Sequence, residues 1–345
     1  MTVTRGGILV RELLDEYGAL TRSALRRWLP QQQPRSYLYD LAADYPFRGG
    51  RMMRPSICIA TAKIFGAAND DVLPAACGIE LLHNALLIHD DIEDESQERR
   101  GRPTLQRLAG APLAINAGDF LAFLSLRPLL QARERLGARM VLRMFEELDR
   151  MAQETAEGQA LDLGWRRDNL IQLRETDYLE MVLKKTCWLA TILPLRLGAL
   201  VGGRDPLDLE HFVRFGFFLG AAFQIQDDLL NLVGDHQHYG KELSGDLWEG
   251  KRTLMLIRLF ERANPDERER IREVLAPPRE QRTSASVQWL RKLMDVYGCI
   301  EYARALAHGL AGAAVHEFEL LFGDLPDGRD LHFLESLPRW VIERA

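Results

Sequence analysis

Apolar residues recur at intervals of three and four along most of this 345-residue chain, and few windows alternate apolar with polar residues. Intervals of three and four place side chains on one face of an α-helix, whereas alternation is typical of a strand. Long segments are also rich in Ala, Leu, Glu and Arg, which favour helices. The sequence therefore predicts an all-α protein whose helices share a core.

Breaks in this pattern are short. Segments rich in Gly, Pro and Arg occur at residues 48–55, 100–103, 202–206, 234–250 and 276–286, and each is typical of a loop between helices. Length alone would permit about two domains, but no segment has the length or composition of a flexible linker. We expect a single domain over residues 1–345, with its motifs within about 40–270 and further helices from about 285 to 345. The 276–286 segment, with Pro277 and Pro278, is expected to be the most flexible loop.

Composition narrows the class of protein. Hydrophobic residues make up 47% of the chain and charged residues 27%, which are globular proportions. Lys and Arg number 44 against 50 Asp and Glu, a net charge of −6, so the overall basic charge typical of nucleic-acid binding is missing. Four cysteines stand singly, which predicts reduced thiols in a cytoplasmic protein. The charged N-terminus and the short apolar runs predict a soluble protein with neither signal peptide nor transmembrane helix.

Two segments are expected to be central helices. The first runs from about Asp70 to Asp94, with Asn69, Asp70 and Asp71 as N-cap candidates and Pro74 in its first turn. It is apolar on nearly every face between residues 72 and 88, as a helix surrounded by other helices should be. The second runs over about residues 209–232 and is rich in phenylalanine.

Both helices end in clustered carboxylates. Asp90 and Asp94 are four residues apart and share a face, and Asp91 lies about 100° round the helix. Such a cluster beside apolar surface is costly, because like charges repel and burial penalises ions. A divalent cation would reverse that cost. The second helix repeats the layout with Asp227, Asp228 and, in the last place, Asn231.

If the two helices face each other, their oxygen-rich ends flank one cavity. Mg²⁺ prefers oxygen ligands and is usually held by a few carboxylates together with substrate phosphates. The pattern therefore predicts a phosphorylated ligand between the helices. A solvated helix end is the alternative for either motif alone, but two motifs on matching helices favour function.

Basic residues lie near these motifs in the sequence. Arginine suits bidentate phosphate binding. For any one of these cations a surface charge is the simpler interpretation, and their joint occurrence beside two acidic helix ends is what indicates a phosphate site. They occur within residues 49–55, 99–103 and 184–186, at Lys241 and at Lys251.

Taken together, these residues resemble the trans-type isoprenyl diphosphate synthases, or polyprenyl synthetases, and geranylgeranyl diphosphate synthases in particular. Residues before about 40 and after about 270 contribute little to the resemblance. The matching segments follow the family's order: 49–55 (GGRMMRP), 80–84 (ELLHN), 90–94 with 99–104, 158–162, 185–186, 223–231 and 240–253.

The resemblance implies an isoprenoid synthase fold, a helical bundle around a central cavity, in a prenyltransferase that joins an allylic diphosphate head to tail with isopentenyl diphosphate. It implies a homodimer and three Mg²⁺ ions per active site, held by Asp90, Asp91, Asp94, Asp227, Asp228 and Asp246. The allylic diphosphate would be gripped by Arg100, Lys185, Lys241 and Lys251, with Thr186 and Gln224 along the allylic side. Isopentenyl diphosphate would be bound by Gly50, Arg51, Arg54, His83 and Arg99.

Product length should depend on the floor of a tunnel beneath the first acidic motif. Ala85 and Leu86 lie about one turn before Asp90, where the fifteen-carbon enzymes of the family carry bulky aromatics. We therefore expect a tunnel open beyond fifteen carbons and a twenty-carbon geranylgeranyl product, with farnesyl and longer polyprenyl products as alternatives. A residue on the helix that contains Asn116 to Phe120 would set the floor.

Two residues depart from the family pattern. Arg51 stands where the family commonly has Lys, and Asn231 replaces the usual final Asp of the second motif. His89 is expected to pack or to donate a hydrogen bond, because Mg²⁺ disfavours imidazole.

Three rival functions are considered. A terpene cyclase is one, because residues 227–235 loosely mimic a cyclase metal motif, and a non-catalytic subunit of a heteromeric synthase is another. A four-helix di-iron protein is the third, but the Glu-x-x-His pairs that it needs at facing positions are not found in the sequence. Five of the six motif aspartates persist, and elongation rather than cyclisation is favoured by Arg51, Arg54, His83, Lys185 and Lys251.

Overall fold

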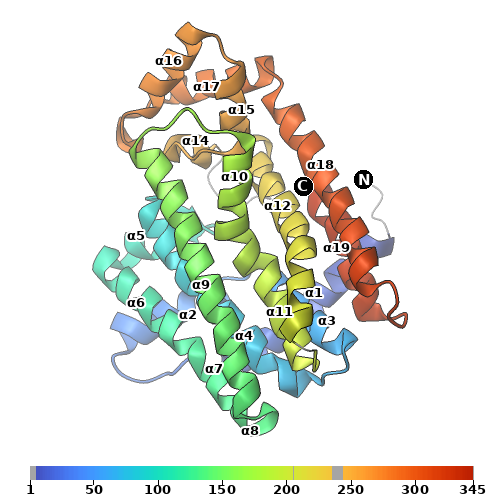
Figure 1. Ribbon diagram of the computed structural model, residues 1–345. Coiled ribbons are helices and arrows are strands. Elements are labelled where there is room, and N and C mark those ends of the chain that lie inside the picture. Colours follow the sequence, from blue (N-terminus) through green and yellow to red (C-terminus); the bar gives the residue numbers. More distant parts are fainter. Residues whose placement is uncertain (1–4, 205, 235–243, 345) are drawn as a thin grey trace.

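The computed structural model of the chain describes residues 5–204, 206–234 and 244–344, and it is built almost entirely of helices (Figure 1). The all-α prediction is confirmed. The α-helices are α1 (Arg5–Leu25), α2 (Asp40–Phe47), α3 (Met53–Ile64), α4 (Asn69–Glu93), α5 (Leu105–Ala109), α6 (Ala111–Leu124), α7 (Leu126–Gln131), α8 (Arg133–Leu136), α9 (Ala138–Arg167), α10 (Glu175–Val182), α11 (Leu193–Val201), α12 (His211–Val233), α14 (Gly245–Glu249), α15 (Leu254–Arg262), α16 (Pro265–Leu275), α17 (Ser284–Val296), α18 (Cys299–Phe322) and α19 (Arg329–Glu343). Two π-helices, η1 (Arg35–Tyr39) and η2 (Leu183–Ile192), and two 3₁₀-helices, η3 (Pro206–Glu210) and η4 (Arg279–Gln281), complete the helical elements.

A short hairpin follows α4. Strands β1 (Glu98–Arg99) and β2 (Arg102–Pro103) pair antiparallel, within and beside the loop expected at 100–103. Arg100 and Gly101 form its turn with φ of 54° and 69°, the left-handed region that a tight turn requires. The hairpin brings Arg99 back onto the end of α4, where it contacts Asp91.

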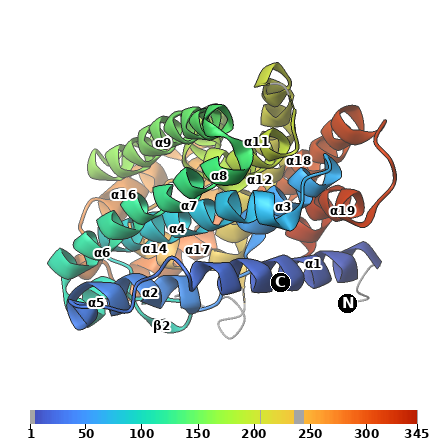
Figure 2. The same ribbon diagram turned by 90° about the horizontal axis from the view of Figure 1, so that it is seen from below.

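The two predicted central helices are α4 and α12. Helix α4 packs against α3 and α6, while α12 packs against η2 and α18. Figure 2 shows α9 and α1 on opposite sides of the layer that contains α3 and α4. In detail the start of α4 differs from the prediction, since Ala68 occupies the N-cap position, no side chain caps the helix and Pro74 lies inside it.

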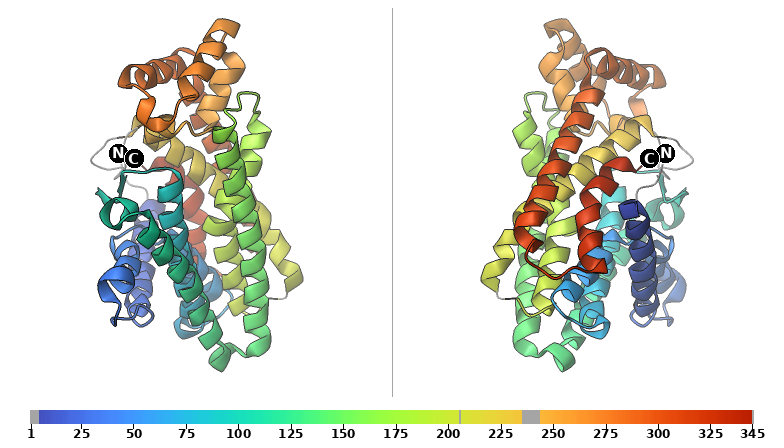
Figure 3. Two further views of the ribbon diagram at one scale, coloured as in Figure 1. Left: turned by 90° about the vertical axis from the view of Figure 1, so that its left-hand side faces the viewer. Right: turned by 90° about the vertical axis from the view of Figure 1, so that its right-hand side faces the viewer.

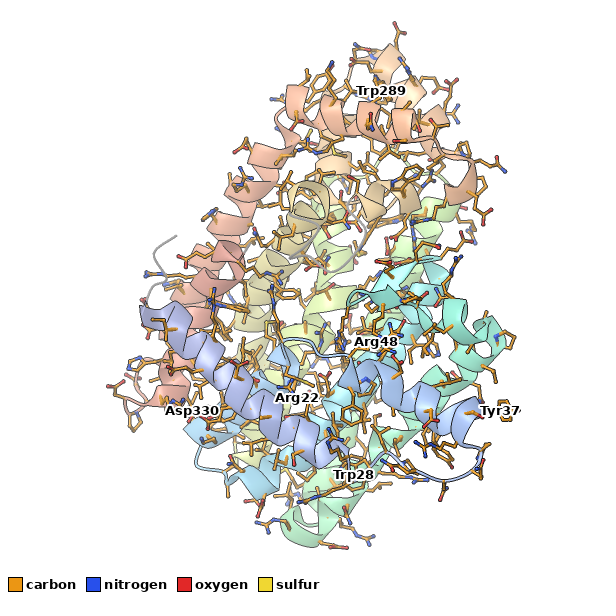
Figure 4. All side chains as sticks on the ribbon, turned by 180° about the vertical axis from the view of Figure 1, so that it is seen from behind. Arg22, Trp28, Tyr37, Arg48, Trp289 and Asp330 are labelled. Atoms are coloured by element: carbon orange, nitrogen blue, oxygen red, sulfur yellow. The ribbon has the colours of Figure 1, made fainter. Side chains whose placement is uncertain are left out.

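The expected loop at 234–250 is in part helical, because α14 lies within it. Lys241 falls outside the described residues. At the far end of the chain, α16 and α17 gather at one end of the molecule (Figure 3). Helix α1 crosses the back, with Asp330 of α19 beside it (Figure 4), and the Tyr17 hydroxyl donates a hydrogen bond to that carboxylate.

Two helical stretches are long and apolar enough to cross a membrane by length and composition alone, which differs from the prediction of none. They are residues 69–93 and 111–136, with mean hydropathies of 1.4 and 1.3. The first is α4, and 67% of its most apolar window is buried among other helices. A core helix passes the same test, so the two stretches are weak grounds for a membrane span.

The π-helix η2 lies against α9, and their backbones touch. A Cβ added to Gly158 of α9 would lie 2.2 Å from the backbone nitrogen of Lys185, so only glycine permits this approach. The two successive lysines of η2 diverge: Lys184 pairs with Glu154 and Glu157, and Lys185 pairs with Asp162. Helix α9 therefore holds η2 in a fixed register.

Candidate active site

A cavity of about 760 Å³ lies between α4, α9, η2 and α12. One end carries charged side chains from the ends of these helices, and the remainder is mainly apolar. The charged and polar lining includes Gly50, Arg51, Arg54, His83, Asp90, Arg99, Arg100, Lys185, Thr186, Gln224, Asp227, Lys251 and Arg344. The apolar lining includes Leu82, Leu86, Leu87, Met151, Ala152, Ala156, Leu163 and Leu189. The cavity thus joins a polar end to an apolar interior.

The three aspartates of the first motif face three different directions. Asp90 lines the cavity, and its Oδ1 lies 3.4 Å from the Lys185 Nζ. Asp91 is fully buried and accepts hydrogen bonds from the Tyr45 hydroxyl at 2.5 Å and from the Arg99 Nε at 3.0 and 3.1 Å. Both of its oxygens are therefore engaged. Asp91 does not line the cavity in this structure, and its role as a metal ligand stays a prediction.

Asp94 lies at the end of α4 and is almost fully buried. Its Oδ1 accepts a hydrogen bond of 2.6 Å from the Arg166 Nη2 on α9. Burial and the charge of Asp90 raise the pKa of Asp94 to about 6, against the opposing charges of Lys185 and Arg166. Burial and the neighbouring carboxylate thus disfavour the ionised form of Asp94, and added positive charge nearby would favour it.

The second motif also has one open and one buried aspartate. Asp227 lines the cavity. Asp228 accepts hydrogen bonds from the Tyr178 hydroxyl at 2.8 Å and from the Gln224 Nε2 at 2.7 Å. Burial and the charge of Asp246, against that of Lys251, raise the pKa of Asp228 to about 7.

Asn231, the departure from the family pattern, anchors the next acidic residue. Its Oδ1 accepts a hydrogen bond of 3.1 Å from the backbone nitrogen of Asp246, and its carbonyl accepts one of 2.8 Å from that of Ser244. An aspartate at position 231 could accept the same bonds but would add a further negative charge. The amide therefore positions the turn that carries Asp246.

Predicted cations surround the acidic ends. The Lys185 Nζ lies 2.6 Å from Asp162 and the Lys251 Nζ lies 3.9 Å from Asp246. The charges of Asp162 and Asp90 raise the pKa of Lys185 against the effect of burial. The Thr186 hydroxyl donates to the Gln224 Oε1 at 2.9 Å, so these two residues, predicted to lie on the same side, do so.

The residues expected to bind isopentenyl diphosphate meet at the polar end. The buried Nε of Arg54 has no hydrogen-bond partner among the described residues, and burial lowers the pKa of Arg54 to about 10 despite the nearby charge of Glu80. Arg100, which was expected to grip the allylic diphosphate, lies beside these residues and donates from Nη1 to the Tyr45 carbonyl at 2.8 Å. A Cβ at Gly50, which has φ of +114°, would lie 2.9 Å from the Arg100 Nη2. An anion here would supply the acceptor that Arg54 lacks.

The chain-length candidates separate. Leu86 lines the cavity, whereas Ala85 is fully buried in a second apolar cluster with Tyr45, Leu81 and Leu121. Adjacent residues of a helix point about 100° apart, and this places Ala85 toward α6. None of residues 116–120 lines the cavity, which is instead closed by α9. Ala85 and residues 116–120 are thus not among the residues that line this cavity, and their roles in setting chain length stay predictions.

His89 lines the cavity wall and faces α6. Its Nε2 lies 3.3 Å from Asp119, and a Cβ at Gly118 would lie 2.4 Å from that nitrogen. The ring thus packs over Gly118, in agreement with the expected packing role.

Sequence reasoning missed several residues of the site. Arg344 donates to the Phe223 carbonyl at 2.9 Å and lies 3.5 Å from Asp227, and Glu249 is buried beside Asp94 and Asp246, whose charges join burial in raising its pKa. Arg344 is 117 residues from Asp227, so no local pattern could have linked them. Glu249 lies two residues before Lys251, in a stretch that also contains Asp246. This local pattern could have pointed to Glu249 as a residue of the site.

The donor set fits a divalent cation. Among the described residues no three carboxylate or imidazole side chains converge at metal-binding distance. Asp90 and Asp227 line one cavity, however, and burial together with neighbouring carboxylates raises the pKa values of Asp94, Asp228 and Glu249. A hard cation with carboxylate and phosphate ligands would oppose that effect.

Comparison with known proteins identifies the family of the chain. Residues 36–294 match the family model described as polyprenyl synthetase. The short chain isoprenyl diphosphate synthase of Methanothermobacter thermautotrophicus is 31% identical over 336 residues, which cover 97% of this chain and 98% of the relative.

Solved structures share the fold over nearly the whole chain. Geranylgeranyl pyrophosphate synthetase from Pyrococcus horikoshii Ot3 has a TM-score of 0.85 at 29% identity, covering 98% of each chain. Polyprenyl synthase from Caulobacter crescentus CB15, in complex with calcium and isoprenyl diphosphate, has a TM-score of 0.83 at 27% identity, covering 96% of this chain and 97% of that one. The chain therefore belongs to the polyprenyl synthetase family and is a prenyltransferase.

Proposed function

We propose that this prenyltransferase joins an allylic diphosphate head to tail with isopentenyl diphosphate and releases a twenty-carbon geranylgeranyl diphosphate. The observation that carries the proposal is the single cavity with acidic helix ends and unpaired basic nitrogen at one end and apolar side chains in the rest. Diphosphates suit the charged end, and a prenyl tail suits the apolar interior, because burial of hydrocarbon is favourable.

Two different groups of residues bind the two substrates. Lys185 and Lys251 lie between the acidic motifs and grip the allylic diphosphate, together with Arg100 and Lys241. Thr186 and Gln224 line its allylic end. Arg51 and Arg54, with Gly50, His83 and Arg99, hold isopentenyl diphosphate, and the unpartnered Arg54 Nε supports this role.

A divalent cation completes the charged end, and we propose Mg²⁺, with three ions per site. Asp90, Asp91, Asp94, Asp227, Asp228 and Asp246 would hold these ions. The Caulobacter polyprenyl synthase in complex with calcium and isoprenyl diphosphate supports a divalent ion here. When bound, Mg²⁺ supplies positive charge that stabilises the departing pyrophosphate.

The reaction needs no protein nucleophile. The allylic carbon–oxygen bond breaks with its electron pair leaving on pyrophosphate, whose charge Lys185 and Lys251 stabilise. The isopentenyl double bond attacks the allylic carbon, and the proton lost afterwards passes to the released pyrophosphate. Leu86, Leu189 and their apolar neighbours exclude water, which would otherwise trap the cation as an alcohol.

The cavity continues inward from the acidic motifs, which suits the tail of a prenyl diphosphate. Leu82 lies eight residues before Asp90 on α4, about 12 Å at the helical rise, and still lines the cavity. On α9, Met151 lies eleven residues before Asp162, about 16 Å, and lines it as well. Farnesyl and longer polyprenyl diphosphates are the alternative products.

The test is product sizing. Purified protein is incubated with labelled isopentenyl diphosphate, Mg²⁺ and each of the five-, ten- and fifteen-carbon allylic diphosphates. A predominant twenty-carbon product is expected from all three. A predominant fifteen-carbon or thirty-carbon product would refute the length, and consumption of allylic substrate without isopentenyl diphosphate would favour the cyclase. A non-catalytic subunit would turn over none of them.

We also propose a cytoplasmic homodimer. All four cysteines are free and buried, which suits a reducing compartment. Large apolar side chains are exposed on the neighbouring helices α6, α7 and α9, and include Phe123, Leu130 and Leu142. An apolar surface of this kind is typical of an interface between subunits.

A further inference from the structure

The loop that precedes α3 has a strained backbone. Gly49 and Gly50 have φ of 97° and 114°, and Met52, which is not a glycine, has φ of 51°. A methionine in the left-handed region is strained, because its Cβ approaches the carbonyl oxygen that follows. Such a conformation persists only where the surrounding structure holds it. The loop carries Arg51 and leads into Arg54, two residues proposed to bind isopentenyl diphosphate.

The carbonyl group of Met52 is held by α3. Met52 is the N-cap residue of that helix, and its carbonyl oxygen accepts hydrogen bonds from the backbone nitrogen of Ser56 at 3.1 Å and from the Ser56 Oγ at 2.8 Å. These bonds do not involve the Met52 side chain. The residue is almost fully buried and lines the cavity, so its side chain needs a support of its own.

Helix α1 provides that support. A Cβ added to Gly18 of α1 would lie 3.1 Å from the Met52 Cβ and 3.2 Å from its Cγ. Carbon atoms pack best at about 3.5–4.0 Å, so the site has no room for a side chain at position 18. Glycine therefore lets the backbone of α1 lie directly against the Met52 side chain, on its way to the cavity.

Helix α1 is anchored at the residue next to Gly18. Tyr17 is fully buried, and its hydroxyl donates a hydrogen bond to Asp330 of α19 and accepts one of 2.8 Å from the Lys63 Nζ of α3. Lys63 also lies 3.6 Å from the Asp330 carboxylate. Helix α1 crosses the back of the molecule, with Asp330 beside it (Figure 4). Because α1 cannot move away from Met52 without breaking these contacts, it is a rigid support.

We propose that Gly18 is a positioning residue for isopentenyl diphosphate, because it lets α1 hold Met52 in its left-handed conformation and thereby fixes the directions of Arg51 and Arg54. This inference rests on the proposed function. Helix α1 lies outside residues 36–294, which the family model matches, so it would serve the site without carrying a motif. The competing explanation is that Gly18 only allows α1 to pack. In that case its substitution would lower stability without weakening the binding of isopentenyl diphosphate.

The first experiment compares Gly18→Ala with the matched control Gly309→Ala. Both glycines lie within helices, where alanine favours the helix, but a Cβ at Gly309 of α18 meets nothing within 4 Å. At position 18 the added methyl should displace Met52 and turn the two arginines away from the diphosphate. The Kd of isopentenyl diphosphate should then rise about tenfold. Isothermal titration calorimetry in chelator measures this binding without metal or turnover, and the control should match the wild type.

Steady-state kinetics give an independent measurement. In Gly18→Ala the KM for isopentenyl diphosphate should rise about tenfold, while kcat and the KM for the allylic diphosphate stay within about twofold. Lys185 and Lys251, which are proposed to grip the allylic diphosphate, lie on other segments and should not move. A merely structural defect would lower the melting temperature without discriminating between the two substrates.

A double-mutant cycle with Met52→Gly tests whether Gly18 acts through Met52. Glycine at position 52 has no side chain for the added methyl to displace, and it adopts positive φ without strain. In this background Gly18→Ala should change the Kd of isopentenyl diphosphate by less than about twofold. The comparison remains valid if the single Gly18→Ala variant does not fold, because the double variant has room for the methyl group.

The outcomes separate the two proposals. A wild-type Kd in folded Gly18→Ala, or an approximately tenfold loss of affinity from Met52→Gly to the double variant, would overturn the positioning role. A wild-type protein that neither binds isopentenyl diphosphate nor turns over any allylic substrate would instead refute the proposed function.

Discussion

Arg99 clasps Asp91 from the hairpin that follows α4, with its Nε 3.0 and 3.1 Å from the two carboxylate oxygens. Both side chains are almost fully buried. Their pairing divides the first acidic motif into a structural member and two members that remain near the cavity.

Removing Asp91 should therefore lower stability. Asp91→Ala removes the nearer counter-charge of the buried Arg99 guanidinium and leaves it only the 3.4 Å contact with Asp90, and breaking a buried ion pair typically costs about 3–5 kcal/mol. Chemical denaturation followed by circular dichroism measures the loss. Asp168→Ala, which breaks the exposed pair with Arg167, should cost less than about 1 kcal/mol. Equal stability of the two variants would contradict the structural role.

Removing Asp90 should abolish activity and leave stability nearly unchanged. Its side chain is 27% exposed and faces the cavity, so Asp90→Ala should abolish turnover while the melting temperature stays within a few degrees of wild type. Steady-state assays with saturating Mg²⁺ and both substrates measure this. Near-normal rates would remove Asp90 from the proposed cation site.

Product length should respond to Leu86 rather than Ala85. Leu86→Phe narrows the cavity and should shift the product toward fifteen carbons. Ala85→Phe overpacks the cluster around Tyr45 and Leu121 and should cost about 1–3 kcal/mol of stability without shortening the product. Chromatographic sizing of labelled products distinguishes them. A shorter product from Ala85→Phe, with an unchanged product from Leu86→Phe, would show that Ala85 lines the tunnel.

Stability of the metal-free protein should fall as pH rises from about 4 to about 7. The pKa values of Asp94 and Asp228 are raised from 3.8 to about 6 and about 7. In this range the folded state binds more protons than the unfolded state, so the free energy of unfolding decreases with pH. Thermal melts in chelator should show the decrease, and Asp228→Asn should flatten it. A melting temperature that rises over this range in chelator would contradict the assignment.

The proposed homodimer can be disrupted by charge. Phe123 on α6 is 74% exposed and Leu142 on α9 is 61% exposed. Phe123→Asp/Leu142→Asp should give a monomer by light scattering, because the buried interface would contain unpaired carboxylates. Leu320→Asp, on α18 with 70% exposure, should leave the dimer intact. A wild-type monomer would refute the proposal.

The sequence predicted the main helices and the elements that carry the site, because α4 and α12 are unusually apolar and end in recognisable acidic clusters. It could not show which carboxylate of a cluster faces the cavity. That depends on rotation of α4 against its neighbours, and the rotation sends Asp91 toward Tyr45 and Ala85 toward α6. The same limit applies to Arg166 and Arg344, whose contacts with Asp94 and Asp227 join segments 72 and 117 residues apart.

The π-helical geometry of η2 makes this stretch sensitive to insertions and deletions. Lys184 turns to Glu154 and Glu157 on the outer side of α9, while Lys185 turns inward to Asp162. A π-helix accommodates an extra residue within an α-helical run, and loss of one residue upstream would move Lys185 into the surroundings of Lys184 and put Thr186 in the place of Lys185. A change in the length of η2 would thus replace the cation that this helix presents to the charged end of the cavity.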